Sequence, residues 1–156
     1  MNTRRTVVAG LIASLVMGMI EMVYEAVGGA GFWAAPVYIG ATVLRGLQSV
    51  PRPVPFNFWG VVLGLMGHMM NSVILGLIFA AIVSRGARSR GSLVGWAVIY
   101  ALAVFVVMWY VVAPAIDPVL LNLNATVFAI AHIMWGVVLG WALSRSTEGA
   151  LQPKRA

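Results

Sequence analysis

Three ionisable side chains interrupt apolar segments of this sequence, and all three are of types that bind metals, haem or protons. Glu21 follows an uncharged stretch, and His68 and His132 lie in the charge-free segments 53–84 and 118–144. Neutral imidazole and carboxylate bind iron, zinc or copper, and two histidines can hold a haem. A buried carboxylate beside an imidazole can also exchange protons with it. The residue types therefore leave three chemistries open: a metal site, a bis-histidine haem site and a proton relay.

Methionines accompany both histidines, since Met69 follows His68 directly and Met134 comes two residues after His132. A thioether ligand favours cuprous copper, so the candidate metal ligands are Glu21, His68, His132, Met69 and Met134. The candidate cofactors are haem b, held by His68 and His132, or a transition metal such as copper or iron. The alternative is packing alone, because methionines often fill gaps in apolar cores and intramembrane histidines often hydrogen-bond a neighbouring helix.

No signature of a hydrolytic or nucleotide-binding enzyme is present in the sequence. The absence of cysteine excludes disulfides, thiolate metal sites, iron–sulfur clusters and cysteine nucleophiles. The patterns H-E-x-x-H, G-x-S-x-G and the P-loop do not occur. We therefore expect no catalytic residues and a function other than catalysis.

The segments that carry these residues are long and apolar enough to cross a membrane. Of the 156 residues, 62% are hydrophobic and 9% are charged, and the mean hydropathy is +0.96. Too few polar side chains remain to cover a soluble globule, whereas a membrane helix needs only about 20 apolar residues. We predict a single all-α domain over 1–156, embedded in the lipid bilayer, with four transmembrane helices at about 6–27, 58–84, 92–113 and 123–144.

The first connection between these helices is rich in aromatic residues, among them Phe32, Trp33 and Tyr38. Aromatic residues favour the membrane interface. We therefore predict an interfacial segment at about 32–50, with a short helix at about 36–48. The polar tail at 146–156 is expected to fray.

Basic residues are distributed unevenly between the two predicted sides of the membrane. The N-terminus, the loop 85–90 and the tail carry eight basic residues and Glu148, a balance of +7. The other side carries two basic and three acidic residues, a balance of −1, and the two balances sum to the net charge of +6. Basic loops stay in the cytoplasm, so both termini are predicted to be cytoplasmic. No nucleic-acid partner is expected, because the arginine cluster lacks interleaved aromatics and fits anionic lipid.

An internal repeat relates the two halves of the chain. The strings "HMMNSVILG" from His68 and "HIMWGVVLG" from His132 share the pattern H-x-M-x-x-V-x-L-G. Each half then forms a helical hairpin, and both hairpins have the same orientation in the membrane. The sequence predicts that His68 and His132 occupy matched positions.

Small residues recur at every fourth position on both histidine-bearing helices. Such stripes let another helix approach closely in lipid, so both histidines are predicted to face helix seams. Counting about 1.5 Å per residue from the arginine at each helix end places Glu21, His68 and His132 within about one turn of one another. We expect these three side chains to converge in the outer half of the bilayer. The stripes are Gly60, Gly64, His68, Ser72, Gly76, Ala80 and Ser84 in the first half, and His132, Gly136, Gly140 and Ser144 in the second.

The chain resembles uncharacterised small bacterial inner-membrane proteins with four helices. The resemblance lies in "VVAGLIASLVMGM", in "GFWAAPVYIGAT", and in "GHMMNSVILGLIFA" echoed by "AHIMWGVVLGWAL". It implies the four-helix fold and a location in the bacterial inner membrane, and it carries no activity.

Three functions remain open at this point. The leading hypothesis is a non-catalytic accessory or structural subunit of a larger, possibly redox, membrane complex, bound to other integral membrane subunits or to itself. A haem- or metal-binding electron-transfer module is the first alternative. A small proton-coupled transporter is the second, which the apolar stretches "LGLIFAAIV" and "VVLGWAL" disfavour because they offer little polarity for a pathway.

Overall fold

The computed structural model describes residues 2–84 and 89–151, and this part of the chain is helical with no strand. The long helices are α1 (Thr3–Val27), α3 (Phe58–Val83), α4 (Arg90–Val107) and α6 (Ala125–Leu151). A π-helical segment, Met108–Val112, and a short helix α5 (Ala113–Ile116) extend α4. Four helical stretches are therefore long and apolar enough to cross a membrane, as predicted: Thr3–Val27, Phe58–Val83, Arg90–Ile116 and Ala125–Arg145.

The start of each long helix is set by a short polar side chain. Asn2, Asn57, Ser89 and Asn124 each accept a hydrogen bond from a backbone N–H in the first turn of the helix that follows. Such caps satisfy amide groups that have no partner within the helix, which matters most in a chain with so little other polarity.

The π-helical segment in the α4 extension has a local cause in Pro114. Proline has no N–H to donate, and its ring collides with the carbonyl group four residues earlier, here that of Tyr110. The backbone over Met108–Val112 widens to π-helical hydrogen bonding instead of breaking. The span consequently reaches Ile116.

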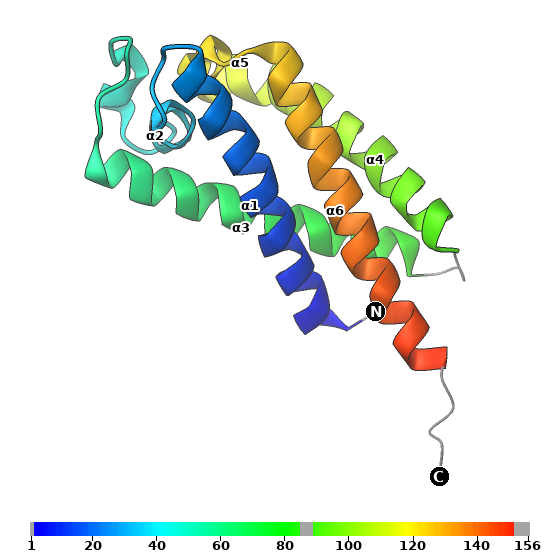
Figure 1. Cartoon of the computed structure of the whole chain (residues 1–156). Coiled ribbons are helices and arrows are strands. Elements are labelled where there is room, and N and C mark those ends of the chain that lie inside the picture. Colours follow the sequence, from blue (N-terminus) through cyan, green and yellow to red (C-terminus); the bar gives the residue numbers. More distant parts are fainter. Residues whose placement is uncertain (1, 85–88, 152–156) are drawn as a thin grey trace.

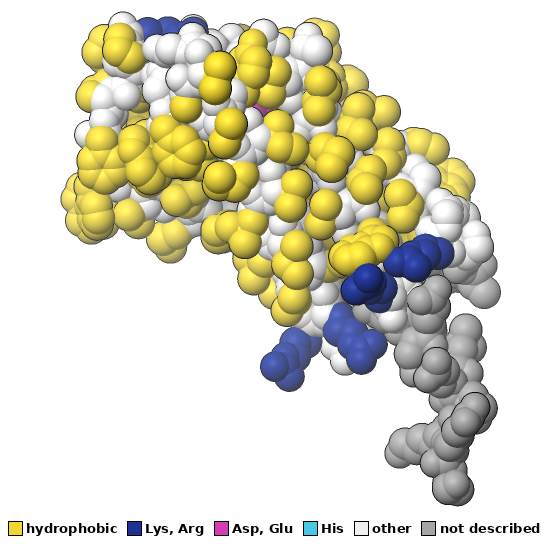
Figure 2. Space-filling view, viewed as in Figure 1, with side chains coloured by type: hydrophobic (Ala, Val, Ile, Leu, Met, Phe, Trp, Pro, Cys, Tyr) yellow, Lys and Arg dark blue, Asp and Glu magenta, His cyan; other side chains and the backbone are white. Residues whose placement is uncertain are grey.

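Helices α1 and α6 lie side by side at the centre of the molecule (Figure 1). Helix α4 packs on the side of α6 away from α1, while α3 crosses behind α1 and α6 and contacts α4 only slightly. The arrangement is therefore an open bundle in which α3 and α4 form opposite flanks. Apolar side chains cover most of the surface between the two ends in Figure 2, as a membrane span requires.

The predicted small-residue stripes do lie at helix contacts. On α6, a Cβ added to Gly136 would lie 2.7 Å from the carbonyl oxygen of Ala97, and one added to Gly140 would lie 2.8 Å from Cα of Val94. On α3, a Cβ added to Gly76 would lie 3.8 Å from Cα of Gly10 on α1. Because these positions lack side chains, neighbouring backbones approach within van der Waals contact.

A buried hydrogen-bond chain links three of the long helices. The indole Nε1–H of Trp135 donates to Oγ of Ser72 at 2.6 Å, and this hydroxyl donates to the carbonyl of Gly10 at 2.7 Å. The hydroxyl of Tyr100 on α4 donates to the carbonyl of Leu75 on α3 at 3.1 Å. In lipid, where water is absent, such bonds hold helices in one register.

The predicted interfacial helix is not confirmed. The segment instead forms α2 (Ala34–Gly40) and a 3₁₀ turn, Arg45–Ser49, and six of the seven α2 residues are buried. Helix α2 packs into the bundle because Gly60 and Gly64 of α3 leave room for its backbone, so that Gly40 contacts Gly60 directly. An amphipathic helix lying at an interface would expose one face, whereas α2 is apolar on all sides.

The predicted repeat is also not confirmed as an arrangement of matched hairpins. Helix α1 does pack on α3, and α4 does pack on α6. However, α3 diverges from the bundle and carries α2, whereas α6 packs on α1 and α4 and carries no such short helix in the part of the chain that the structure describes. The shared sequence pattern therefore does not produce matched surroundings.

Candidate functional site

Glu21 and His68 line the same pocket, of about 30 Å³, between α1, α2 and α3. Its remaining walls are apolar: Met17, Gly18 and Met22 from α1, Ala35, Pro36 and Ile39 from α2, Gly64 and Leu65 from α3, with Leu123 and Phe128. This volume is enough for one water molecule. The pocket exists because α2 closes the gap between α1 and α3.

The His68 ring reaches across from α3 to α1. Its Nε2 lies 3.1 Å from the carbonyl oxygen of Ser14. A carbonyl oxygen only accepts, so Nε2 carries the proton and Nδ1 of the neutral ring is left as an acceptor. Gly18 of α1 lies beside the ring, since a Cβ added there would be in van der Waals contact with Nε2 at 3.5 Å.

The Glu21 carboxyl group is buried without a partner. The residue is 4% exposed, and neither carboxyl oxygen makes a hydrogen bond within the described chain. An ionised carboxylate in such surroundings is costly unless it is paired, so the group is stable only when it holds a proton or accepts hydrogen bonds from a molecule in the pocket. Among the described carboxyl groups, Glu21 is the buried one without a hydrogen-bond partner, and this leaves it free for proton or ligand chemistry.

His132, the third predicted site residue, lies outside this pocket. Its Nδ1 bonds the carbonyl of Phe128 on its own helix at 2.8 Å, and its ring packs against Phe128 and Phe105, with centroids 4.5 and 5.8 Å away. The surroundings of His132 are therefore aromatic, whereas those of His68 include a carboxyl group.

Within residues 2–84 and 89–151, no group of three histidine or acidic side chains stands close enough to hold a metal ion. Met134 is 37% exposed on the outside of α6, and Met69 is half-buried. Haem or metal binding by His68 and His132 stays a prediction.

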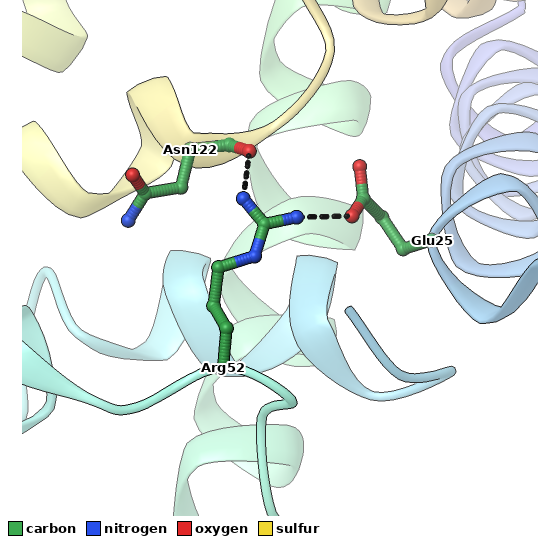
Figure 3. Close-up of polar contacts among 3 residues, drawn as sticks. All are labelled: Glu25, Arg52 and Asn122. Atoms are coloured by element: carbon green, nitrogen blue, oxygen red, sulfur yellow. Dashed lines mark hydrogen bonds and ion pairs between the residues drawn. The ribbon is translucent and has the colours of Figure 1, made fainter. Parts of the chain in front are cut away.

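Sequence reasoning missed a second polar group, at the end of the bundle that holds α2. Glu25, one turn beyond Glu21, is 2% exposed, and its carboxylate lies 3.5 Å from the guanidinium group of Arg52. Figure 3 shows the same guanidinium group donating to the backbone carbonyl of Asn122, at 3.1 Å. Glu25 therefore has the counter-ion that Glu21 lacks.

Asp117 joins the two connections at this end. It accepts a hydrogen bond from the Thr42 hydroxyl at 2.7 Å and another from the Gln48 side-chain amide. Gln48 in turn accepts from the backbone N–H of Val119 at 3.2 Å, and Arg45 donates to the carbonyl of Ile116 at 2.5 Å. These hydrogen bonds fasten the connection 28–57 to the connection 117–124. The sequence shows only that Asp117 lies between two predicted helices, and it gives no sign of these contacts.

Tyr38 of α2 is fully buried, and its hydroxyl has no hydrogen-bond partner within the described chain. Burial raises the pKa of this phenol above its ordinary value of 10.0, Arg52 opposes the rise and Glu25 adds to it. The sequence predicts that the aromatic residues of this segment lie at the membrane interface. Hydropathy does not show that Tyr38 instead points into the protein.

The structure therefore shows four apolar helices compatible with an integral membrane protein, and one pocket that joins Glu21 to His68. No protein-family model, curated protein or solved structure matches this chain.

Proposed function

We propose that this protein is a non-catalytic, multi-pass subunit of a larger membrane assembly, and that it works by packing against other transmembrane helices. The observation that carries this proposal is the openness of the bundle. In the most apolar 18-residue stretches, 39% of α1 and 44% of α6 are buried, against 22% of α3 and 17% of α4. Fewer than half of the residues are thus buried in each stretch, and the share is smallest on α3 and α4.

The most closely packed part of the molecule lies at its centre and at the α2 end. Helices α1 and α6 are packed on two sides, and the Asp117 and Arg52 hydrogen bonds fasten the connections. Helices α3 and α4 pack on this frame with one side, and their outer sides are exposed to the surroundings. A frame with open flanks suits a protein that binds other helices within the bilayer.

A photo-crosslinking amino acid in place of single exposed residues tests this role in native membranes. Suitable positions are Ile78 on α3 and Ile99 on α4, which are 46% and 59% exposed, and the matched control is the fully buried Leu139. We expect a discrete protein adduct from at least one flank and none from position 139. Adducts with lipid alone at every exposed position would contradict the proposal.

We further propose that the protein resides in a bacterial inner membrane with both termini in the cytoplasm. The support is the charge balance of +7 against −1, which sums to the net charge of +6. Reporter fusions after residue 50 and at the C-terminus should give opposite signals. Equal signals would contradict this topology.

A proton-coupled carrier is the second candidate, and the observation that favours it is the unpartnered Glu21 carboxyl group beside His68. Buried carboxyl and imidazole groups inside membrane spans recur in proton pathways. The test is proton uptake by vesicles that contain the purified protein. Glu21→Gln should abolish the uptake and Glu25→Gln should retain it, while uptake equal to that of empty vesicles rules the candidate out.

A further inference from the structure

One polar residue on the exposed flank of α3, Asn71, belongs to none of the sites described above. Asn71 is exposed, and no hydrogen bond joins its side chain to any residue that the structure describes. It lies 13 residues after Phe58 and 12 before Val83, so it occupies the middle of the span.

Neither His68, three residues earlier on the same helix, nor any other described residue forms a hydrogen bond with the Asn71 side chain. With a rise of about 1.5 Å per residue, either end of α3 is about 18 Å or more away along the helix, beyond the reach of a short side chain. Large apolar side chains flank it, among them Met70, 63% exposed, and Ile74, 47% exposed. A carboxamide in hydrocarbon without a hydrogen bond is unfavourable, so the position calls for a polar partner from outside the chain.

The same side of α3 also permits close approach. Gly67 lies one turn before Asn71, and a Cβ added there would meet only Cγ2 of Ile39, at 4.0 Å. A small residue one turn from an amide allows two helices to cross closely enough for a hydrogen bond.

We infer that a second copy of this chain docks on the exposed flank of α3, with Asn71 of one copy bonded to Asn71 of the other. This inference rests on the proposed function, in which the flanks bind other helices. A carboxamide both donates and accepts, so two identical amides satisfy each other across a twofold axis. Two copies inserted in the same orientation present Asn71 at the same depth, which a twofold axis along the membrane normal requires.

Cysteine crosslinking tests the inference directly, because the natural chain contains no cysteine. Ile74→Cys lies one turn from Asn71 on the exposed side of α3, and Ile99→Cys on α4 is the matched control. Oxidation in native membranes should yield a disulfide-linked dimer from Ile74→Cys and none from Ile99→Cys. Dimers that form equally from both positions would reflect random collision and overturn the inference.

The role of the amide is tested in the same background. Asn71→Leu should lower the dimer yield by about 3-fold and at most about 18-fold, the range of hydrogen bonds between membrane helices, whereas Asn71→Gln should retain it. Both substitutions face outward, so the helices should still form, which circular dichroism checks. An unchanged yield in Asn71→Leu overturns the inference, as does an Ile74→Cys adduct with a different protein only. That last result leaves the proposed function standing, while an absence of protein adducts at both flanks contradicts both.

Discussion

His68 and His132 begin the same nine-residue pattern, yet the structure gives them different chemistry. His68 reaches across to the Ser14 carbonyl of α1 and lines a pocket with the unpartnered Glu21. His132 bonds a carbonyl of its own helix and is enclosed by aromatic rings. The opposing helix makes the difference, because α1 offers a glycine and a carboxyl group where α4 offers Phe105. A repeated motif thus fixes where a histidine lies along a helix, and the neighbour fixes what it can do.

The largest expected effect comes from displacing α2, which packs beside His68 and has no counterpart described beside His132. Gly64→Ala places a Cβ against the Pro36 backbone, which cannot move aside as a side chain can. We expect α2 to be displaced and the free energy of unfolding to fall by about 3 kcal/mol, as in overpacked cores. Thermal unfolding in detergent measures the change. Gly95→Ala is the control, since nothing lies within 4 Å of its Cβ position, and equal effects of the two substitutions would show that α2 packing is unimportant.

The next effect separates the two carboxyl groups of α1. Glu21→Met removes a buried group that has no partner, so it should raise the free energy of unfolding by about 1 to 3 kcal/mol. Glu25→Met leaves Arg52 without its counter-ion, and because the Arg52 side chain is 46% exposed we expect a loss of at most about 1 kcal/mol. Chemical denaturation of both variants measures the signs. A destabilising Glu21→Met would mean that the carboxyl group has a partner in the membrane.

A smaller effect distinguishes the two histidines. His68→Phe removes a hydrogen bond between helices, so the free energy of unfolding should fall by about 0.6 to 1.7 kcal/mol. His132→Phe removes a bond within one helix and keeps an aromatic ring among aromatic rings, so it should change stability less. The same unfolding measurement ranks them. The opposite ranking would place the structurally important histidine in the second half of the chain.

The smallest effect at neutral pH concerns Tyr38. Its pKa is raised by burial, so the folded state binds the phenolic proton more tightly than the unfolded state, whose pKa is near 10.0. The resulting stability is fully present below pH 10.0 and is lost as pH rises through the folded pKa. Unfolding midpoints across alkaline pH should therefore fall less in Tyr38→Phe than in the natural chain. Identical pH profiles would show that Tyr38 is accessible to water.

The fold was predictable where its cause is local. Three charge-free segments, and an apolar stretch that continues through Glu21, predicted four spans, because backbone groups in hydrocarbon must be paired within a helix. The stripe of Gly136 and Gly140 also lies against α4 as expected, since only small residues let helix backbones meet. The depth count brought Glu21 and His68 to one level, and they share a pocket.

Counting residues along a helix gives the depth of a side chain in the membrane but not its direction around the helix axis. The count therefore could not show that His132 faces Phe105 instead of the pocket. Hydropathy could not show that α2 inserts beside Gly60 and Gly64, because a segment rich in apolar and aromatic residues is equally suited to an interface or to a core. The sequence by itself determined that four helices are long and apolar enough to cross a membrane, since transfer of apolar residues into lipid depends on composition. Only the tertiary structure decided which polar groups meet, because hydrogen bonds and ion pairs require atoms from distant segments at one point in space.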